Sequence, residues 1–483
     1  MRHTLLLTAL LAAPLAHAQP GTLDPSFGGV GFVTTDLGYS DVAWALALQP
    51  DGKIVVGGEK IGGSAMFLAR YLPDGALDPA FGTGGIVNGG AQAAYDLAIQ
   101  PDGKILVVGG VSSVFYLARY LPDGTLDPAF GTGGIVVTDV SEQGYATSTS
   151  LALQPDGKVV VAGYRGLGPK FTMIRVLPDG ALDPTFGDGG VVRAPVVVDV
   201  EEVPIALTAD GKILVALNPP LGGWQYYLAR FQTDGGLDGS FELVFGCCWD
   251  SGKMEDILVQ PDGKILIAQR GSGNQGSVFR FHPDGPRDLS FGDGGGTDAT
   301  GGNELALQPD GKIVVVSGWY CGSSCSEARI ARLLPDGTLD PSFGEGGSTI
   351  TSMGNVRFWD LALQPDGRIV AGGGWGDIGV ARYLNDLTVA TEPEPTAEGL
   401  ALSAPSPHPF RGATRLTLTV PSPQPVRVAL YDALGREVAV LHDAHTATGT
   451  HALTLDGSML APGVYVVRAE GRDGVTVGRA VRY

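Results

Sequence analysis

Two short phrases recur through most of this 483-residue chain. One is an apolar run followed by Gln-Pro-Asp-Gly-Lys, sometimes varied, with its turn aspartate at seven places from Asp51 to Asp366. The other is Leu-Asp-Pro-x-Phe-Gly, also seen seven times in strict or varied form. The chain opens with an unpaired second phrase, Leu23–Gly28, and the repeats close with an unpaired first phrase, Gln364–Arg368. A closed ring explains this split, because an N-terminal strand can complete the last unit.

One repeat unit spans about fifty residues and contains four strand-like runs. In the first unit these runs are Trp44–Gln49, Ile54–Gly57, Phe67–Leu72 and a last strand that begins at Gly85–Val87. Tight Pro-Asp-Gly turns separate them, since proline fixes φ and glycine accepts a positive φ. Four short antiparallel strands at this period predict an all-β, seven-bladed β-propeller, with residues 30–35 as the outer strand of the last blade.

The two ends of the chain differ from the repeats. Residues 1–18 have the basic start, short apolar stretch and small residues of a secretory signal peptide. Residues 19–386 form the predicted propeller, 387–402 an acidic, Pro-rich linker, and 403–483 a small β-sandwich domain. No other apolar run is long enough to cross a membrane, so we expect no transmembrane segment.

The charge and the cysteines restrict the partners of the protein. The formal net charge is −19, concentrated in the repeats, which argues against binding to nucleic acid or to an anionic membrane. In an exported chain we expect four oxidised cysteines. Cys321 and Cys325 can close one loop, whereas the adjacent Cys247 and Cys248 form a strained ring or pair elsewhere. No histidine lies near either pair, so a metal site there has no support.

The repeated phrases resemble those of the delta-60 repeat family of bacterial surface and secreted proteins. The match covers residues 21–386, because Leu-Ala-Leu-Gln-Pro-Asp-Gly-Lys and Leu-Pro-Asp-Gly-x-Leu-Asp-Pro-x-Phe-Gly recur in order. Two units depart from the pattern: the fourth reads Thr-Ala-Asp-Gly-Lys at 208–212, and the fifth has Asp288-Leu289 in place of Asp-Pro. The resemblance implies a β-propeller and transfers no catalytic residues.

Three blocks near the C-terminus resemble a type IX secretion C-terminal sorting domain. They are Ala404–Phe410, Val428–Val438 and Leu460–Arg468, in the order of that family. The resemblance implies a partnership with the outer-membrane type IX machinery and a secreted or surface location. It also implies removal of the domain, within the linker near 390–399. The alternative is an ordinary sandwich domain that stays attached.

The repeats leave one varied face, built by the loops between second and third strands and between blades. All six tryptophans map to this loop face: Trp44, Trp224, Trp249, Trp319, Trp359 and Trp375. Trp44, Tyr95 and Trp359 occupy the same repeat position in three blades that a ring makes consecutive. We therefore expect an aromatic cluster at the mouth of the central channel, either packed as core or available to stack on a sugar or a partner's side chain.

Carboxylates occupy the next repeat position in four blades: Asp96, Asp256, Glu304 and Asp360. As inner-strand starts they would point around the channel mouth, where they would hold a cation, hydrogen-bond sugar hydroxyls or simply be solvated. The candidate ligand-binding residues are therefore Trp44, Tyr95, Asp96, Asp256, Glu304, Trp319, Trp359, Asp360 and Trp375.

No catalytic set is evident, because the repeats hold a single histidine, His282, in a turn context. We predict a non-enzymatic, surface-exposed binding module for an extracellular carbohydrate or protein. The alternatives are a structural envelope protein without a discrete ligand and a glycan-active enzyme that uses only carboxylates. No cofactor is expected; Ca²⁺ at the turn aspartates is the alternative, although no dense oxygen-ligand loop supports it.

Overall fold

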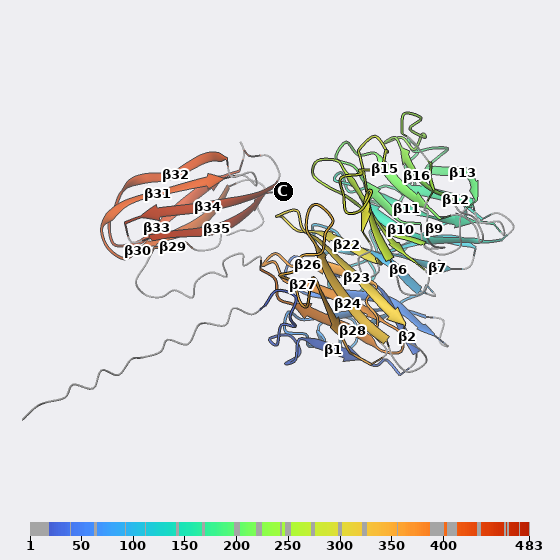
Figure 1. The fold of residues 1–483 in the computed structure, drawn as a ribbon, viewed down its shortest axis with the longest axis horizontal. Helices are drawn as coiled ribbons and strands as arrows, with labels where there is room; N and C mark the ends of the chain where they lie inside the picture. The colour runs from blue at the N-terminus through green and yellow to red at the C-terminus, as the bar shows by residue number, and fades with distance from the viewer. Residues whose placement is uncertain are drawn as a thin grey trace, which may run out of the picture. The chain divides into compact units, whose positions relative to one another are not determined.

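The computed structural model describes residues 19–482 except 39, 62–64, 92, 112, 142–143, 167–169, 198–202, 219–224, 242–243, 247–252, 272–275, 298–301, 321–325, 355, 387–399, 403–412, 432–435, 458–459, 461–462 and 473. The chain divides into two compact units, Met1–Leu387 and Thr388–Tyr483, which are described separately. In the described part every regular element is a strand (Figure 1). No helix in that part could therefore span a membrane.

The first unit consists of four-stranded antiparallel sheets, each formed by strands that follow one another in the chain, with one exception. The first three are β2 (Ser40–Leu48), β3 (Ile54–Ile61), β4 (Ala65–Tyr71), β5 (Ile86–Asn88); β6 (Ala93–Ile99), β7 (Ile105–Val111), β8 (Val114–Tyr120), β9 (Ile135–Thr138); and β10 (Ala146–Leu153), β11 (Val159–Arg165), β12 (Lys170–Val176), β13 (Val191–Val197). The next three are β14 (Ile205–Leu207), β15 (Ile213–Leu217), β16 (Gln225–Phe231), β17 (Val244–Gly246); β18 (Lys253–Val259), β19 (Ile265–Arg270), β20 (Gly276–Phe281), β21 (Gly296–Thr297); and β22 (Glu304–Leu307), β23 (Ile313–Tyr320), β24 (Ser326–Leu333), β25 (Ser348–Thr351).

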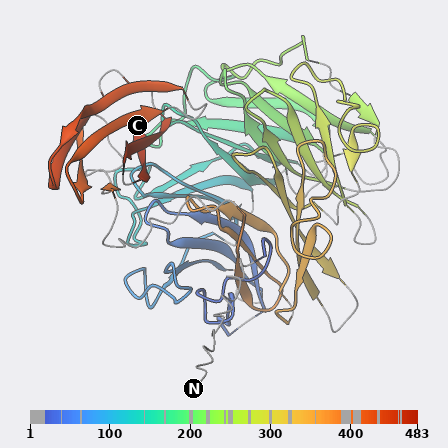
Figure 2. The same ribbon diagram turned by 60° about the vertical axis from the view of Figure 1, so that its left-hand side comes forward.

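The exception is the sheet that joins the two ends of the unit. It combines β26 (Asp360–Leu363), β27 (Ile369–Gly374) and β28 (Ile378–Tyr383) with β1 (Phe32–Thr35), which pairs with β28 as the outer strand. The first strands of successive sheets contact one another from β2 through β26, and β26 contacts β2. The sheets therefore form a closed β-propeller whose last blade contains the N-terminal strand, as the split repeat predicts; Figure 2 shows blue N-terminal strands beside orange ones.

The strands are longer than their apolar runs. β2 begins at Ser40 and β3 continues through Glu59 and Lys60, because the ladder of backbone hydrogen bonds extends past the buried segment. The buried faces pack between neighbouring sheets: Leu68 of one sheet and Val107 of the next share a core. Burial of such apolar side chains supplies most of the driving force for stacking one blade on the next.

A buried arginine in the third strand of each sheet joins that sheet to the next. We call this arginine, together with the aspartate and the phenylalanine that it contacts and the group of the next sheet to which it donates, an arginine joint. Arg119 illustrates it: its guanidinium bonds Asp127 at 2.8 Å, donates to the Pro178 carbonyl of the next sheet at 2.7 Å, and stacks 4.3 Å from the centre of the Phe130 ring. Lys104 adds a second cation 3.2 Å from Asp127. Every sheet of the first unit repeats the arginine–aspartate pair, with Arg70, Arg119, Arg175, Arg230, Arg280, Arg332 and Arg382 as the arginines. Arg332 differs in its bond to the next turn, since it donates to the side chains of Asn385 and Asp386 and not to a backbone carbonyl.

The aromatic member of each joint closes the gap between two sheets. Phe81, Phe130 and Phe186 are fully buried, as expected for residues that plug between blades. Gly124 of the neighbouring Pro-Asp-Gly turn has φ +88°, and a β-carbon there would lie 2.9 Å from the Phe81 ring. Glycine therefore serves both the turn and the close approach of the phenylalanine.

The ring closes through the same joint. Arg382 of the last sheet pairs with Asp24, at 2.8 Å and 358 residues away, donates to the Pro73 carbonyl of the first sheet, and stacks 5.0 Å from the centre of the Phe27 ring. Arg368 replaces the usual lysine, 2.9 Å from Asp24. The unpaired N-terminal phrase is thus the missing part of the last joint.

The second unit contains two packed antiparallel sheets. One orders β29 (Ala401–Leu402), β30 (Ala413–Val420) and β33 (Gly449–Asp456); the other orders β32 (Glu437–Thr446), β31 (Gln424–Tyr431), β34 (Gly463–Gly471) and β35 (Gly474–Arg482). Leu418 and Leu455 of the first sheet share a core with Val428 and Val467 of the second, as in a β-sandwich. β29 falls inside the segment 387–402 that the sequence suggested as linker, because Leu402 pairs with Leu418.

We expect Asp24→Ala to lower the free energy of unfolding by about 3–5 kcal/mol, because it leaves buried Arg382 without its carboxylate. Asp24 is only 3% exposed. Its matched control is Asp139→Ala, since both aspartates accept bonds at 3.0 and 2.7 Å from the N–H and hydroxyl of a serine two residues on. Asp139 is exposed and lies outside the joints.

Denaturant unfolding of the two variants and the wild type measures this difference. The control should unfold like the wild type. Equal stability of both variants would show that the N-terminal phrase does not hold the ring closed.

Candidate functional site

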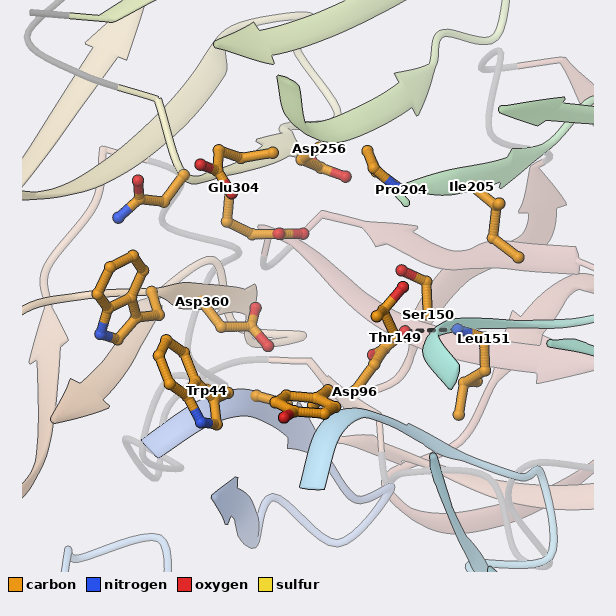
Figure 3. A pocket seen from close by; sticks show the side chains of 15 residues that line it. Trp44, Asp96, Thr149, Ser150, Leu151, Pro204, Ile205, Asp256, Glu304 and Asp360 are labelled. Atoms are coloured by element: carbon orange, nitrogen blue, oxygen red, sulfur yellow. Dashed lines mark hydrogen bonds between the residues drawn. The ribbon is translucent and has the colours of Figure 1, made fainter. Parts of the chain in front are cut away.

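A cavity of about 220 Å³ lies where the first strands of all sheets converge (Figure 3). Each sheet of the first unit contributes two or three residues to its lining, from within its first strand or just before it. The lining residues are Trp44, Ala45, Tyr95, Asp96, Thr149, Ser150, Leu151, Pro204, Ile205, Glu255, Asp256, Asn303, Glu304, Trp359 and Asp360. We call this space the channel cavity.

β-Bulges turn several of these residues toward the channel cavity. The pairing register skips one residue between Ala43 and Ala45, and likewise at the equivalent place in β6, β10 and β18. The unpaired residues are Trp44, Tyr95, Thr149 and Glu255. An extra residue in one strand bends that strand and re-aims its side chain, so the bulge explains why two consecutive residues line one cavity.

Three aromatic rings form one wall of the channel cavity, which we call the aromatic wall. The Trp44 ring lies 5.3 Å from that of Trp359 and 6.5 Å from that of Tyr95, centre to centre, with planes tilted by 52° and 54°. The predicted aromatic cluster at the channel is therefore confirmed. Arg270 lies 5.4 Å from the centre of the Trp359 ring and bonds Glu255 at 2.7 Å.

Three aspartates of the channel cavity also tie neighbouring sheets together. Asp96 accepts the Leu151 N–H of the next sheet at 2.7 Å. Asp256 accepts the Leu305 N–H at 3.0 Å, and Asp360 accepts the Leu46 N–H at 2.5 Å across the ring closure. In each case the carboxylate accepts a hydrogen bond from a backbone N–H within the first strand of the neighbouring sheet. These side chains therefore have a structural role whether or not they bind a ligand.

Burial raises the pKa of these aspartates above the usual range. The pKa of Asp96 rises to about 7, mainly through burial, against the hydrogen bonds from Leu151 and Leu97 and with added repulsion from Asp256. The pKa of Asp256 rises to about 6 for the same main reason. That of Asp360 is also raised well above its ordinary value, by burial and by the charges of Asp96 and Asp256. Near neutral pH the channel cavity therefore holds carboxyl groups close to their titration points.

The structure brings together seven of the predicted ligand-binding residues, all of which line the channel cavity: Trp44, Tyr95, Asp96, Asp256, Glu304, Trp359 and Asp360. Trp375 lies outside the channel cavity, 45% exposed, with Arg357 5.3 Å from its ring centre. Trp319 is placed only through its backbone, opposite Glu327 in β23 and β24. Trp224, Trp249 and all four cysteines (Cys247, Cys248, Cys321, Cys325) fall outside the described residues.

The sequence interpretation missed Thr149, Glu255 and Asn303. All three stand seven residues before a turn aspartate, the same repeat position as Trp44, so an alignment of the repeats would have found them. In the fourth sheet, Pro204 and Ile205 line the channel cavity. Pro204 stands six residues before the turn aspartate, one position later than the repeat position of Trp44. Within the part of the chain that the structure describes, no three His, Cys, Asp or Glu residues cluster as metal ligands would.

Two family models match the chain. A domain of unknown function (DUF5122) β-propeller matches residues 49–81, 100–130, 154–186, 260–291 and 308–343, and a secretion system C-terminal sorting domain matches residues 407–481. The chain thus carries DUF5122 β-propeller repeats, of the delta-60 type, followed by a type IX C-terminal sorting domain. It is a protein exported by type IX secretion to the cell surface or beyond.

No curated protein matches the chain. Among solved structures, a protein of unknown function from Bacteroides caccae is 13% identical, with a TM-score of 0.39, over 63% of this chain and 98% of that one. YCF48 from Cyanidioschyzon merolae is 10% identical, with a TM-score of 0.42, over 73% of this chain and 98% of that one. PorZ, a surface component of the type IX secretion system of Porphyromonas gingivalis, is 11% identical, with a TM-score of 0.32, over 89% of this chain and 68% of that one. These similarities are too distant to assign an activity.

We expect Asp96→Asn to flatten the pH dependence of stability. The pKa of Asp96 is about 7 in the folded chain against 3.8 as the ordinary value, so the folded state keeps a proton that the unfolded state releases. Stability therefore falls as pH rises from 4 to 7, by at most about 1.4 kcal/mol per pH unit for one group. The amide of asparagine does not titrate, and its carbonyl can still accept the Leu151 N–H.

Unfolding curves of the wild type and the variant at pH 5, 6, 7 and 8 measure the slope. Asp139→Asn is the control, because the serine bonds lower the pKa of Asp139 and its titration falls below this window. Parallel slopes for the wild type and Asp96→Asn would contradict the assignment.

Proposed function

We propose that this protein is a surface-displayed binding module whose ligand enters the channel cavity. The observation that supports this is the composition of the cavity lining, which combines an aromatic wall from three sheets with carboxyl groups from the same and from other sheets. Binding sites are typically concave, partly apolar, and equipped with a few convergent polar groups. A sugar ring fits this chemistry, since its apolar face stacks on aromatic rings while its hydroxyls bond carboxylates.

The volume of the channel cavity limits what can enter it. An apolar cavity of about 150 Å³ can hold benzene, so about 220 Å³ suits one substituted six-membered ring. The ligand is therefore a single sugar residue, such as the end of a glycan chain. A side chain of a partner protein is the second candidate, because the aromatic wall would accept it in the same way.

Binding is the better proposal than turnover. Each of the three aspartates uses a carboxylate oxygen to hold a backbone N–H of the next sheet. A carboxylate committed to the scaffold is poorly placed to act as a nucleophile or to shuttle protons through a reaction. The same groups remain able to accept further hydrogen bonds from a bound ligand, because a carboxylate has about four lone-pair sites.

A glycan-array screen of the exported chain, followed by affinity measurement on the hits, tests the proposal. We expect Trp44→Ala and Trp359→Ala to lose about 2 kcal/mol of binding free energy, roughly thirtyfold in Kd, because they open the aromatic wall. Trp375→Ala is the matched control, since Trp375 lies outside the channel cavity.

The control also distinguishes two locations for the site. Loss of binding in Trp375→Ala with normal binding in Trp44→Ala would move the site to the loop face. If the wild-type protein is folded but binds no glycan and no protein of the same cell surface, a structural envelope role is favoured instead.

We further propose that the sorting domain is removed after export by cleavage within residues 387–402. Its support is the acidic, Pro-rich composition of this segment, which joins the two compact units. Linkers of this kind are preferred sites of proteolytic cutting.

Mass spectrometry of the surface-released protein should find a C-terminal peptide that ends between residues 387 and 402. Substitution of that stretch by a Gly-Ser linker of equal length is the companion measurement, and it should slow release or shift the cut. Recovery of peptides that end at Tyr483 from the mature surface form would contradict the proposal.

A further inference from the structure

The lining of the channel cavity is rich in hydrogen-bond acceptors and in ionisable carboxyl groups. Five of its residues are carboxylic acids: Asp96, Glu255, Asp256, Glu304 and Asp360. None of the described residues that line it is a lysine or an arginine. Arg270 is bonded to Glu255 at 2.7 Å, and the other four carboxyl groups line the same space.

The aromatic rings of the channel cavity have carboxyl groups both beside them and across from them. Trp44 and Tyr95 come from β2 and β6, and Trp359 directly precedes β26. Asp96 and Asp360 follow Tyr95 and Trp359 in the same sheets, whereas Asp256 and Glu304 come from β18 and β22. Figure 3 shows Asp256 and Glu304 across the space from Trp44, with Asp360 between them. A ligand that fills the cavity therefore meets the aromatic wall on one side and carboxyl groups both across from that wall and beside it.

A buried acceptor in the same lining points to a donor on the ligand. Asn303 is 5% exposed, and its Nδ2 donates to the Phe358 carbonyl at 2.8 Å. Its Oδ1 is buried and has no hydrogen-bond partner. A buried oxygen without a partner costs free energy, so a donor that reaches it is favoured. This observation is independent of the carboxylates.

We infer that the ligand is an amino sugar whose protonated amine lies among the carboxylates while its ring packs on the aromatic wall. An ammonium group has three donors and no acceptor, which complements the carboxyl groups and the Asn303 Oδ1 of the lining. A hydrogen bond between an ionised donor and a carboxylate is about twice as strong as a neutral one. The inference rests on the proposed function and names the charge of the ligand, which the proposed function leaves open.

The test measures the affinity of the full exported chain for glucosamine, glucose and N-acetylglucosamine by isothermal calorimetry at pH 6.5. Glucosamine should bind at least about tenfold more tightly than glucose, because glucosamine carries a positively charged amine and glucose is neutral. N-acetylglucosamine should behave like glucose, since acetylation removes the charge and keeps the ring. Nα-acetyl-lysine N-methylamide serves as a fourth probe, with an ammonium group but no sugar ring.

Two variants connect the charge preference to the channel cavity. Asp256→Asn keeps the shape of the side chain and should reduce the preference for glucosamine over glucose. The matched control is Asp139→Asn on an exposed loop, which should leave the preference unchanged. Melting curves of both variants confirm that each is folded before its affinity is compared.

Each outcome separates this inference from the proposed function. Equal binding of glucose and glucosamine, lost in Trp44→Ala, would overturn the inference and leave the proposed function standing. Binding of the lysine probe as tight as that of glucosamine would overturn the assignment to a sugar. Failure of all four probes would count against the amino sugar, while a glycan-array hit that depends on Trp44 would still support the binding site.

Discussion

The buried arginine of each third strand is the interaction on which the ring depends. It connects the two repeated phrases: the aspartate and phenylalanine of Leu-Asp-Pro-x-Phe-Gly hold it, and the backbone of the next sheet's turn receives it. A guanidinium removed from water without such partners would destabilise the fold, so the three parts have to occur together. The joint therefore explains why both phrases recur in every unit, and why a stray copy of one phrase at the N-terminus is needed to finish the last sheet.

The fold was predictable because period and turn chemistry repeat along the chain. The split phrase predicted closure through an N-terminal strand, and the pairing of β1 with β28 confirms it. The arginines were equally visible in the sequence, yet their role was not, because an isolated cation in an apolar strand is interpretable only when its partners are known. Those partners come from a distant phrase and from a neighbouring sheet, which a linear reading does not place side by side.

The position of the candidate site was predictable for the same reason, and its composition only in part. The repeat position of Trp44 identified Tyr95 and Trp359, and the structure brings the three rings together. Glu255 and Asn303 share that position but were missed, because the interpretation followed one kind of side chain rather than the position itself. The β-bulges that turn these residues inward depend on strand register, which hydrophobic alternation does not determine.

A carboxyl group at the repeat position of Asp96 is not required in every sheet of the propeller. At the repeat position of Asp96 the first sheet has Ala45 and the third has Ser150, and both sheets still pair and close. A carboxyl group whose pKa is raised by burial lowers stability at neutral pH relative to a side chain that does not titrate. The three aspartates bond the neighbouring sheets, but they do so with buried carboxyl groups gathered in one small space. Proteins tend to break the rules of stable packing where they have a function, and this gathering of buried carboxyl groups is a departure of that kind, which supports the proposed binding site.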